Sequence, residues 1–245
     1  MQRYFIPQPF IDGISVISGD DAKHIQKVMR MQVGNTIIAV SEGQAFEANI
    51  ESFEGQEVRI KKSSEPLRSN ELPKKVTICC GLPKGEKLDL ITQKATELGM
   101  YELILFEAER SIVKWDAQKG SKKQQRLQKI AKEAAEQSHR NVVPNIYDIL
   151  SFKELLQQSK KYDVLFVADE EDAKQEKRTR FVDMLAKTHD QQSILVVFGP
   201  EGGLSRKEID ALMKHGFHSI SLGPRILRAE TAPLYVLSAM SYEFE

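Results

Sequence analysis

The stretch FGPEGGLSRKEI (residues 198–209) decides how the larger part of this chain folds. It follows the apolar run SILVV (193–197), which predicts a buried strand, and it continues into residues with helical spacing. Ser205 and Glu208 have the spacing of a capping box, so a helix begins there. The glycines therefore form a loop at the carboxyl end of a strand, where open α/β sheets bind their ligands.

The same alternation of strand and helix runs from residue 73 to the end of the chain. This order favours a mostly parallel sheet with helices on both faces. We expect strands over 76–82, 102–109, 162–170, 193–199 and 218–223. We expect helices over 87–100, 121–140 and 151–158, a charged helix after 170, a helix from about 205 and a last helix over 230–245.

The first 72 residues have a different pattern, with short apolar segments separated by glycines. They predict the strands of a small barrel or sandwich over 3–6, 15–19, 35–40, 44–53 and 57–62. A helix over 20–30 interrupts them, and Ile25, Val28 and Met29 should share its apolar face. The polar segment 63–75 contains two prolines and is typical of a linker. The sequence therefore predicts two domains, 1–72 and 73–245.

Composition excludes several classes of protein. Lys+Arg and Asp+Glu both number 35, so any basic site for nucleic acid must be a local patch. No run approaches the roughly 20 apolar residues of a membrane span, and the first residues have no secretory leader, which favours a cytoplasmic protein. The adjacent Cys79 and Cys80 should be buried thiols, and no metal-ligand spacing occurs, so we expect no metal.

A second loop, LGPRILRAETA (222–232), also leaves a strand through Gly-Pro. It carries Arg225, Arg228 and Glu230, and Thr231 is expected to cap the last helix. The two Gly-Pro loops should lie near each other in such a sheet, one supplying a carboxylate and the other two guanidinium groups. The plain alternative is a pair of tight turns beside solvated arginines.

Together the two loops resemble the paired signatures of the RsmE family, the 16S ribosomal RNA uridine-N3 methyltransferases of the SPOUT superfamily. Four further stretches agree with that family and extend the resemblance over essentially the full length: RYF (3–5), HIQKVMRMQVGN (24–35), KLDLITQKATELG (87–99) and EAAEQSHRNVVP (133–144). The serine and histidine before Arg140 and the methionine before Arg30 are small departures that concern only fine RNA contacts.

The resemblance implies a small PUA-like β-barrel domain at the N-terminus and a SPOUT α/β domain whose C-terminal part forms a trefoil knot. It also implies S-adenosylmethionine (SAM) as methyl donor, 16S rRNA of the small ribosomal subunit as partner, a homodimer through the knot regions, and no metal. A SPOUT enzyme for another RNA, or a non-catalytic RNA-binding factor of ribosome assembly, remain the alternatives.

The candidate site residues follow from the same two loops. The donor should contact Phe198, Gly199, Pro200, Glu201, Gly202, Gly203, Leu222, Gly223, Ile226, Leu227, Thr231 and Ala232, with a third loop around 168–170. Arg228 is the first candidate for stabilising negative charge on the uracil oxygens, since an arginine cannot act as a base. Glu201 is the second catalytic candidate, and it could orient Arg228, attract the cationic donor or accept a proton.

RNA contacts are expected on local basic surface. Between residues 110 and 140 the chain has nine Lys and Arg against three acidic residues, although a solvated helix face is the plain alternative. Trp115 could stack on a base or belong to the core. The candidates for RNA binding are Arg3, His24, Arg30, Arg110, Lys122, Lys123, Arg126 and Arg140.

Overall fold

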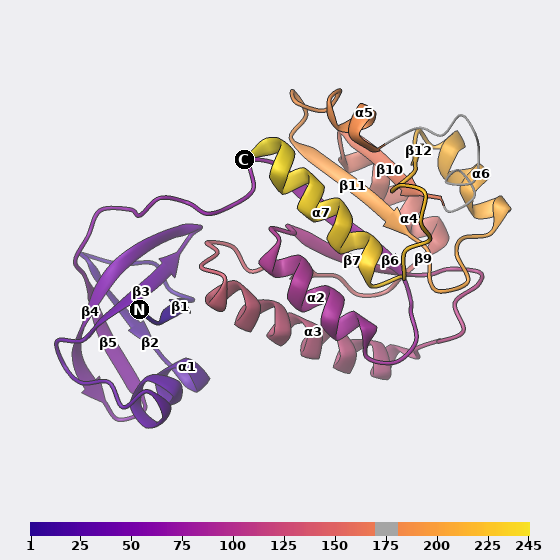
Figure 1. Ribbon diagram of the computed structural model, residues 1–245. Helices are drawn as coiled ribbons and strands as arrows, with labels where there is room; N and C mark the ends of the chain where they lie inside the picture. The colour runs from indigo at the N-terminus through magenta and orange to yellow at the C-terminus, as the bar shows by residue number, and fades with distance from the viewer. Residues whose placement is uncertain (170–180) are drawn as a thin grey trace. The chain divides into compact units, whose positions relative to one another are not determined.

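The computed structural model describes residues 1–169 and 181–245, which form two compact units (Figure 1). Unit 1 comprises Met1–Glu71 and Ala135–Val142, and unit 2 comprises Leu72–Ala134 and Val143–Glu245. The sequence predicted a single division at residue 72. The structure instead includes in unit 1 a segment that follows much later in the chain.

Unit 1 is built on a five-stranded sheet that curls as a half-barrel, as a PUA-like domain should. All five expected strands are present: β1 (Arg3–Phe5), β2 (Ile14–Ile17), β3 (Thr36–Ser41), β4 (Gln44–Glu54) and β5 (Glu57–Lys62). Their order is β1-β3-β4-β5-β2, in which β1 and β3 are parallel and the other pairs antiparallel. The buried faces of these strands enclose an aliphatic core.

The helix expected over 20–30 is present but changes its winding. α1 (Gly19–Lys23) passes into a π-helical turn, η1 (His24–Val28), in which the Met29 N–H donates to the His24 carbonyl at 2.9 Å. Because a π turn is wider than an α turn, the three expected apolar residues do not share a buried face. Ile25 is fully buried, whereas Val28 is 66% exposed. The prediction of one apolar face was wrong for this reason.

Unit 2 contains a fully parallel sheet of seven strands, in the order β12-β10-β11-β6-β7-β8, with β9 also paired to β7. Its strands are β6 (Lys75–Gly81), β7 (Glu102–Glu107), β8 (Asn145–Ile146), β9 (Leu150–Ser151), β10 (Val164–Ala168), β11 (Ser193–Phe198) and β12 (His218–Ile220). The expected parallel α/β sheet is confirmed, with two additional short strands.

Helices cover both faces of this sheet. They are α2 (Lys87–Glu97), α3 (Ala117–Gln137), α4 (Phe152–Gln158), η2 (Ser159–Lys161), α5 (Phe181–Leu185), α6 (Arg206–Lys214) and α7 (Thr231–Phe244). Alternate residues of the strands face opposite layers: Cys80 packs with α2, α3, α5 and α7, and Cys79 with α4 and α6. In Figure 1, α2 and α7 cross the same face of the sheet.

Segment 63–74 has no helix or strand, as expected for a linker. Of the charged helix expected after residue 170, positions 170–180 lie outside the described residues. Within the described ranges, no helix is long and apolar enough to cross a membrane.

Candidate active site

A pocket of about 410 Å³ lies at the carboxyl ends of β10, β11 and β12. The last residue of each of these parallel strands, namely Ala168, Phe198 and Ile220, belongs to its wall. The two Gly-Pro loops form most of the rest. We call residues 199–204 the glycine loop and residues 222–230 the arginine loop. β11 and β12 are not neighbours in the sheet, since β10 lies between them. The loops nevertheless reach the same pocket.

Most residues expected to contact a cofactor line this pocket. They are Phe198, Gly199, Pro200, Glu201, Gly202, Gly203, Leu222, Gly223, Ile226, Leu227 and Ala232. Thr231 is not among the lining residues. It is the first residue of α7 rather than its cap, because Glu230 occupies the cap position. The prediction of Thr231 as the capping residue was therefore wrong by one position.

The glycine loop folds tightly on itself. The Gly203 N–H donates to the Pro200 carbonyl at 2.8 Å, and Gly203 has φ +67°, a conformation that favours glycine. A Cβ atom on Gly199 would lie 2.7 Å from the carbonyl carbon of Gly203. Below the loop, a Cβ on Gly81 of β6 would lie 2.7 Å from the Pro200 ring. The glycines are thus required for close packing of the loop itself.

The capping box predicted at the start of α6 is confirmed, and it also secures a neighbouring loop. The Ser205 hydroxyl accepts from the Glu208 N–H, and the Glu208 carboxylate accepts from the Ser205 N–H at 2.8 Å. The same carboxylate accepts from the N–H of Glu109 at 2.9 Å, in the segment after β7. Glu208 is buried, so these bonds fix the helix start beside the pocket.

Three charged side chains form a cluster at one side of the pocket, and we call it the Lys87 cluster. The Lys87 ammonium lies 2.9 Å from Glu201 Oε1 and 3.2 Å from Glu230 Oε2. Glu201 Oε1 also accepts from the Lys84 N–H at 3.0 Å. Lys87 therefore links Glu201 of the glycine loop to Glu230 of the arginine loop. The cationic partner of Glu201 is this lysine rather than Arg228.

These contacts keep the cluster charged. Burial acts to raise the pKa of Glu201, but hydrogen bonds from the Lys87 side chain and from the N–H groups of Glu201 and Lys84 hold that pKa below its ordinary value. The pKa of Glu230 is lowered as well, against the effect of burial, by its own N–H and by Lys87. The bond to Glu201 is the main reason that the pKa of Lys87 is raised.

Arg228 lies at the open side of the pocket. Its side chain is 83% exposed, and the nearest carboxylate contact is Glu230 Oε1 at 4.0 Å. Arg225, from the same loop, is exposed and also lines the pocket. Both guanidinium groups therefore face solvent at the mouth of the pocket, where an anionic ligand could reach them.

Asp169, from the expected third loop, lines the pocket and forms a two-pronged pair with Arg206, at 2.7 and 2.8 Å, which links the segment after β10 to the start of α6. Three polar residues of the pocket wall were not predicted as cofactor contacts, and Arg206 is the first. Arg110 donates to the Gly202 carbonyl at 3.0 Å. Lys87 is the third. The sequence could have indicated these residues as pocket residues, because each lies in or beside a segment that follows the carboxyl end of a strand. Glu170 of the expected third loop lies outside the described residues.

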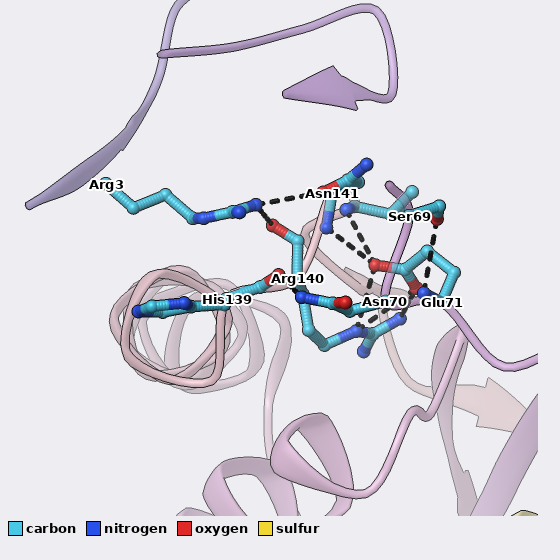
Figure 2. Close-up of polar contacts among 8 residues, drawn as sticks. Arg3, Ser69, Asn70, Glu71, His139, Arg140 and Asn141 are labelled. Carbon is cyan, nitrogen blue, oxygen red and sulfur yellow. Dashed lines mark hydrogen bonds and ion pairs between the residues drawn. The ribbon is translucent and has the colours of Figure 1, made fainter. Parts of the chain in front are cut away.

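Two of the arginines expected to bind RNA belong instead to an internal network of unit 1 (Figure 2). Arg3 donates to the Arg140 carbonyl at 2.7 Å and to Asn141 Oδ1 at 2.9 Å. The Arg140 guanidinium pairs with Glu71, which also accepts from the N–H groups of Asn141 and Val142. Arg3 is 7% and Arg140 2% exposed, so neither side chain can reach a phosphate in this conformation.

The remaining RNA candidates have accessible surface. In unit 1, His24 is half-buried and its Nδ1 lies 2.9 Å from the Tyr4 hydroxyl, whereas Arg30 is exposed. In unit 2, Lys122, Lys123 and Arg126 line a shallow basic groove on α3, where Arg126 also contacts Asp89 at 2.5 Å. Arg110 lies in the pocket wall. Trp115 packs against the core.

No metal-binding group of His, Cys, Asp and Glu occurs in the part of the chain that the structure describes.

Comparisons with known proteins agree with this architecture. Residues 70–241 match the family described as an RNA methyltransferase domain, and residues 17–63 match an RNA methyltransferase PUA domain. A ribosomal RNA small subunit methyltransferase E of Bacillus subtilis (strain 168) is 46% identical, covering 100% of this chain and 98% of that protein. The protein of the same name from Mesomycoplasma hyopneumoniae (strain 232) is 33% identical over 71% of this chain and 73% of its own length.

A solved structure extends this similarity to a bound state. The crystal structure of a ribosomal RNA small subunit methyltransferase E from Neisseria gonorrhoeae, bound to SAM, has 28% sequence identity and a TM-score of 0.88. The match covers 100% of this chain and 98% of that one.

Proposed function

The chain belongs to the ribosomal RNA small subunit methyltransferase E family, and from this premise we propose that it transfers a methyl group from SAM to N3 of a uridine in 16S rRNA. The observation that carries the proposal is the pocket itself. It joins the glycine loop and the arginine loop, which hold the family signatures, at the carboxyl ends of three parallel strands.

The residues of the pocket fit SAM. A volume of about 410 Å³ is within the range of small-molecule sites. Leu222, Ile226 and Leu227 give an apolar wall for an adenine ring, and Ile226 is 65% exposed without a ligand. The glycine loop offers backbone donors and acceptors at close range. Glu201 supplies negative charge for a donor with a net positive charge.

Bound SAM supplies a methyl group on a cationic sulfonium. The protein must bring the uridine in line with that methyl group, so that the N–C bond forms as the methyl–sulfur bond breaks, and the N3 proton must pass to solvent. The Arg228 guanidinium can stabilise negative charge on the uracil carbonyl oxygens. The Glu201 carboxylate already pairs with the Lys87 ammonium and accepts from the Lys84 N–H, so we assign it to electrostatic stabilisation of the site rather than to proton removal.

The experiment that tests this proposal uses SAM labelled with tritium in the methyl group and small ribosomal subunits from cells that lack the protein. Digestion of the RNA then identifies the labelled nucleoside. We expect label in N3-methyluridine from 16S rRNA. Label in another nucleoside or another RNA would overturn the proposed substrate. Absence of both methyl transfer and SAM binding would favour the non-catalytic RNA-binding function.

Arg228 provides the first prediction. We expect Arg228→Ala to keep SAM affinity but to lower methyl transfer by about 100-fold or more, as for the loss of an electrostatic donor. Single-turnover rates and calorimetric SAM binding measure the two effects separately. Arg228→Lys keeps the positive charge but loses the planar guanidinium group. Its rate of methyl transfer should therefore lie between those of the wild type and Arg228→Ala. Near-normal turnover in Arg228→Ala would exclude Arg228 from the chemistry.

RNA binding and assembly belong to the same proposal. We propose that unit 1 and the α3 groove with Lys122, Lys123 and Arg126 contact the RNA backbone, and that the protein acts in the cytoplasm as a homodimer through a trefoil-knotted C-terminal region. Charge-neutral variants of the two lysines should weaken RNA binding and reduce its salt dependence. Light scattering of the purified protein tests the dimer, and a monomer would exclude it.

A further inference from the structure

The structure contains a charged contact that the reaction described above does not use. Lys87 is the first residue of α2, and Glu86, at the cap position, makes no side-chain capping bond. A cation at a helix N-terminus is disfavoured, because the positive end of the helix dipole lies there. Local rules are broken in this way mainly where a function compensates for the cost.

The compensation comes from two loops that are far apart in the sequence. The Lys87 ammonium bridges Glu201 of the glycine loop and Glu230 at the end of the arginine loop, at 2.9 and 3.2 Å. The Lys84 N–H reaches the same oxygen of Glu201 at 3.0 Å. The turn before α2 and the first residue of α2 therefore each contribute one donor to the same carboxylate of the pocket wall.

The position of this bridge separates it from an ordinary surface ion pair. Lys87 and Glu201 both line the pocket, and the three side chains are 30%, 31% and 16% exposed, respectively for Lys87, Glu201 and Glu230. Without the ammonium, two carboxylates would face each other across the two loops and repel. With it, the cluster keeps one net negative charge, which complements a donor with one net positive charge.

We propose that Lys87 is a positioning residue of the SAM pocket, which ties the glycine loop to the start of α7 and holds both loops at the separation that the donor requires. This inference rests on the proposed function. Lys87 acts through Glu201 and Glu230. A role of this kind predicts weaker donor binding when the bridge is lost, and recovery when another cation restores it.

The test compares Lys87→Met, Lys87→Arg and Lys94→Met by calorimetric titration with SAM. Lys94 lies on the same helix and pairs with Glu97, outside the pocket. We expect Lys87→Met to raise the Kd for SAM about tenfold, since contacts within one network couple strongly. Lys87→Arg should recover most of the affinity, and Lys94→Met should equal the wild type.

The single variant Glu230→Gln keeps the inference testable if Lys87→Met folds poorly, and a double-mutant cycle extends the test if it folds. Glu230→Gln alone should weaken SAM binding in the same direction. Adding Lys87→Met to it should cost less than the two single effects together, and simple additivity would overturn the inference. So would a wild-type Kd in Lys87→Met, or a Lys87→Arg as weak as Lys87→Met. Failure of the wild type to bind SAM would instead overturn the proposed function itself.

Discussion

Gly199 and Gly202 lie three positions apart in the glycine loop, but a side chain has different consequences at each. At Gly199 a Cβ would lie within 2.9 Å of backbone atoms of Gly203 and Leu204, which cannot move without unfolding the loop. At Gly202 it would lie 3.2 Å from the Arg110 Cβ, a tight contact that a small shift of Arg110 would relieve. Gly199 is therefore needed for the shape of the loop, and Gly202 for the approach of Arg110.

This difference predicts a graded mutant series. Gly199→Ala should abolish SAM binding and destabilise unit 2 by about 1–3 kcal/mol, the usual cost of overpacking. Gly202→Ala should have a smaller effect, and Gly202→Val, with a branched side chain against Arg110, should abolish binding. The control is Gly120→Ala in α3, where nothing lies within 4 Å and a small gain in stability is expected. Calorimetry and urea unfolding measure both quantities, and equal behaviour of Gly199→Ala and Gly202→Ala would contradict the argument.

At the scale of elements, strand β6 lies in the middle of the unit 2 sheet and contains both cysteines. Cys79 and Cys80 face opposite layers and are 0% and 2% exposed, as predicted for buried thiols. Burial raises the pKa of Cys80 to about 12, and it raises the pKa of Cys79 well above its ordinary value of 9.0. Both thiols thus stay protonated in the folded strand.

These shifts predict alkaline sensitivity. A raised folded-state pKa gives stability that is complete below the unfolded pKa near 9.0 and is lost as pH rises toward the folded pKa. The free energy of unfolding should fall by up to about 1.4 kcal/mol per pH unit for each thiol between pH 9 and 12. Urea unfolding at several pH values measures the slope. The double variant Cys79→Ala/Cys80→Ala should flatten it, and an unchanged slope would contradict the assignment.

Most elements could be predicted from the sequence, because periodicity, caps and turn residues are local signals. The strands of the unit 1 sheet, all strands of the unit 2 sheet except β8 and β9, and the capping box of Ser205 were predicted in this way. The π turn after Lys23 could not be, since hydrophobic spacing assumes α-helical winding. Nor could the Lys87 cluster, because its partners lie in two distant loops. The burial of Arg140 was missed for the same reason: its carboxylate partner is Glu71.

At the scale of the whole molecule, the network around Glu71 determines which residues belong to unit 1. Glu71 accepts bonds from Arg140, Asn141 and Val142, and Arg3 holds the same segment from the other end of the unit 1 sequence (Figure 2). The Arg140 side chain is only 3% exposed, so the carboxylate balances a nearly buried charge. Segment 135–142 is thereby an integral part of unit 1.

Glu71→Gln should therefore loosen unit 1. It removes the negative charge beside Arg140 while keeping the size of the side chain, and a cost of about 3 kcal/mol is expected for breaking such a buried pair. Hydrogen exchange should show faster exchange at β1 and over 135–142. The matched control is Glu51→Gln, whose partners Arg59 and Lys61 are largely exposed and whose loss should cost less than about 1 kcal/mol. Equal exchange rates in the two variants would contradict this role of Glu71.

The two-part sequence of unit 1 also has a consequence for biosynthesis. Arg3 and Glu71 leave the ribosome long before Arg140 and Asn141 are made, so the nascent half-barrel must persist without its closing segment. At roughly 5–20 residues per second, that interval lasts several seconds. During it, the Arg3 guanidinium and the Glu71 carboxylate lack the partners that segment 135–142 later supplies, and a shortened gene ending at residue 72 would prolong that state indefinitely.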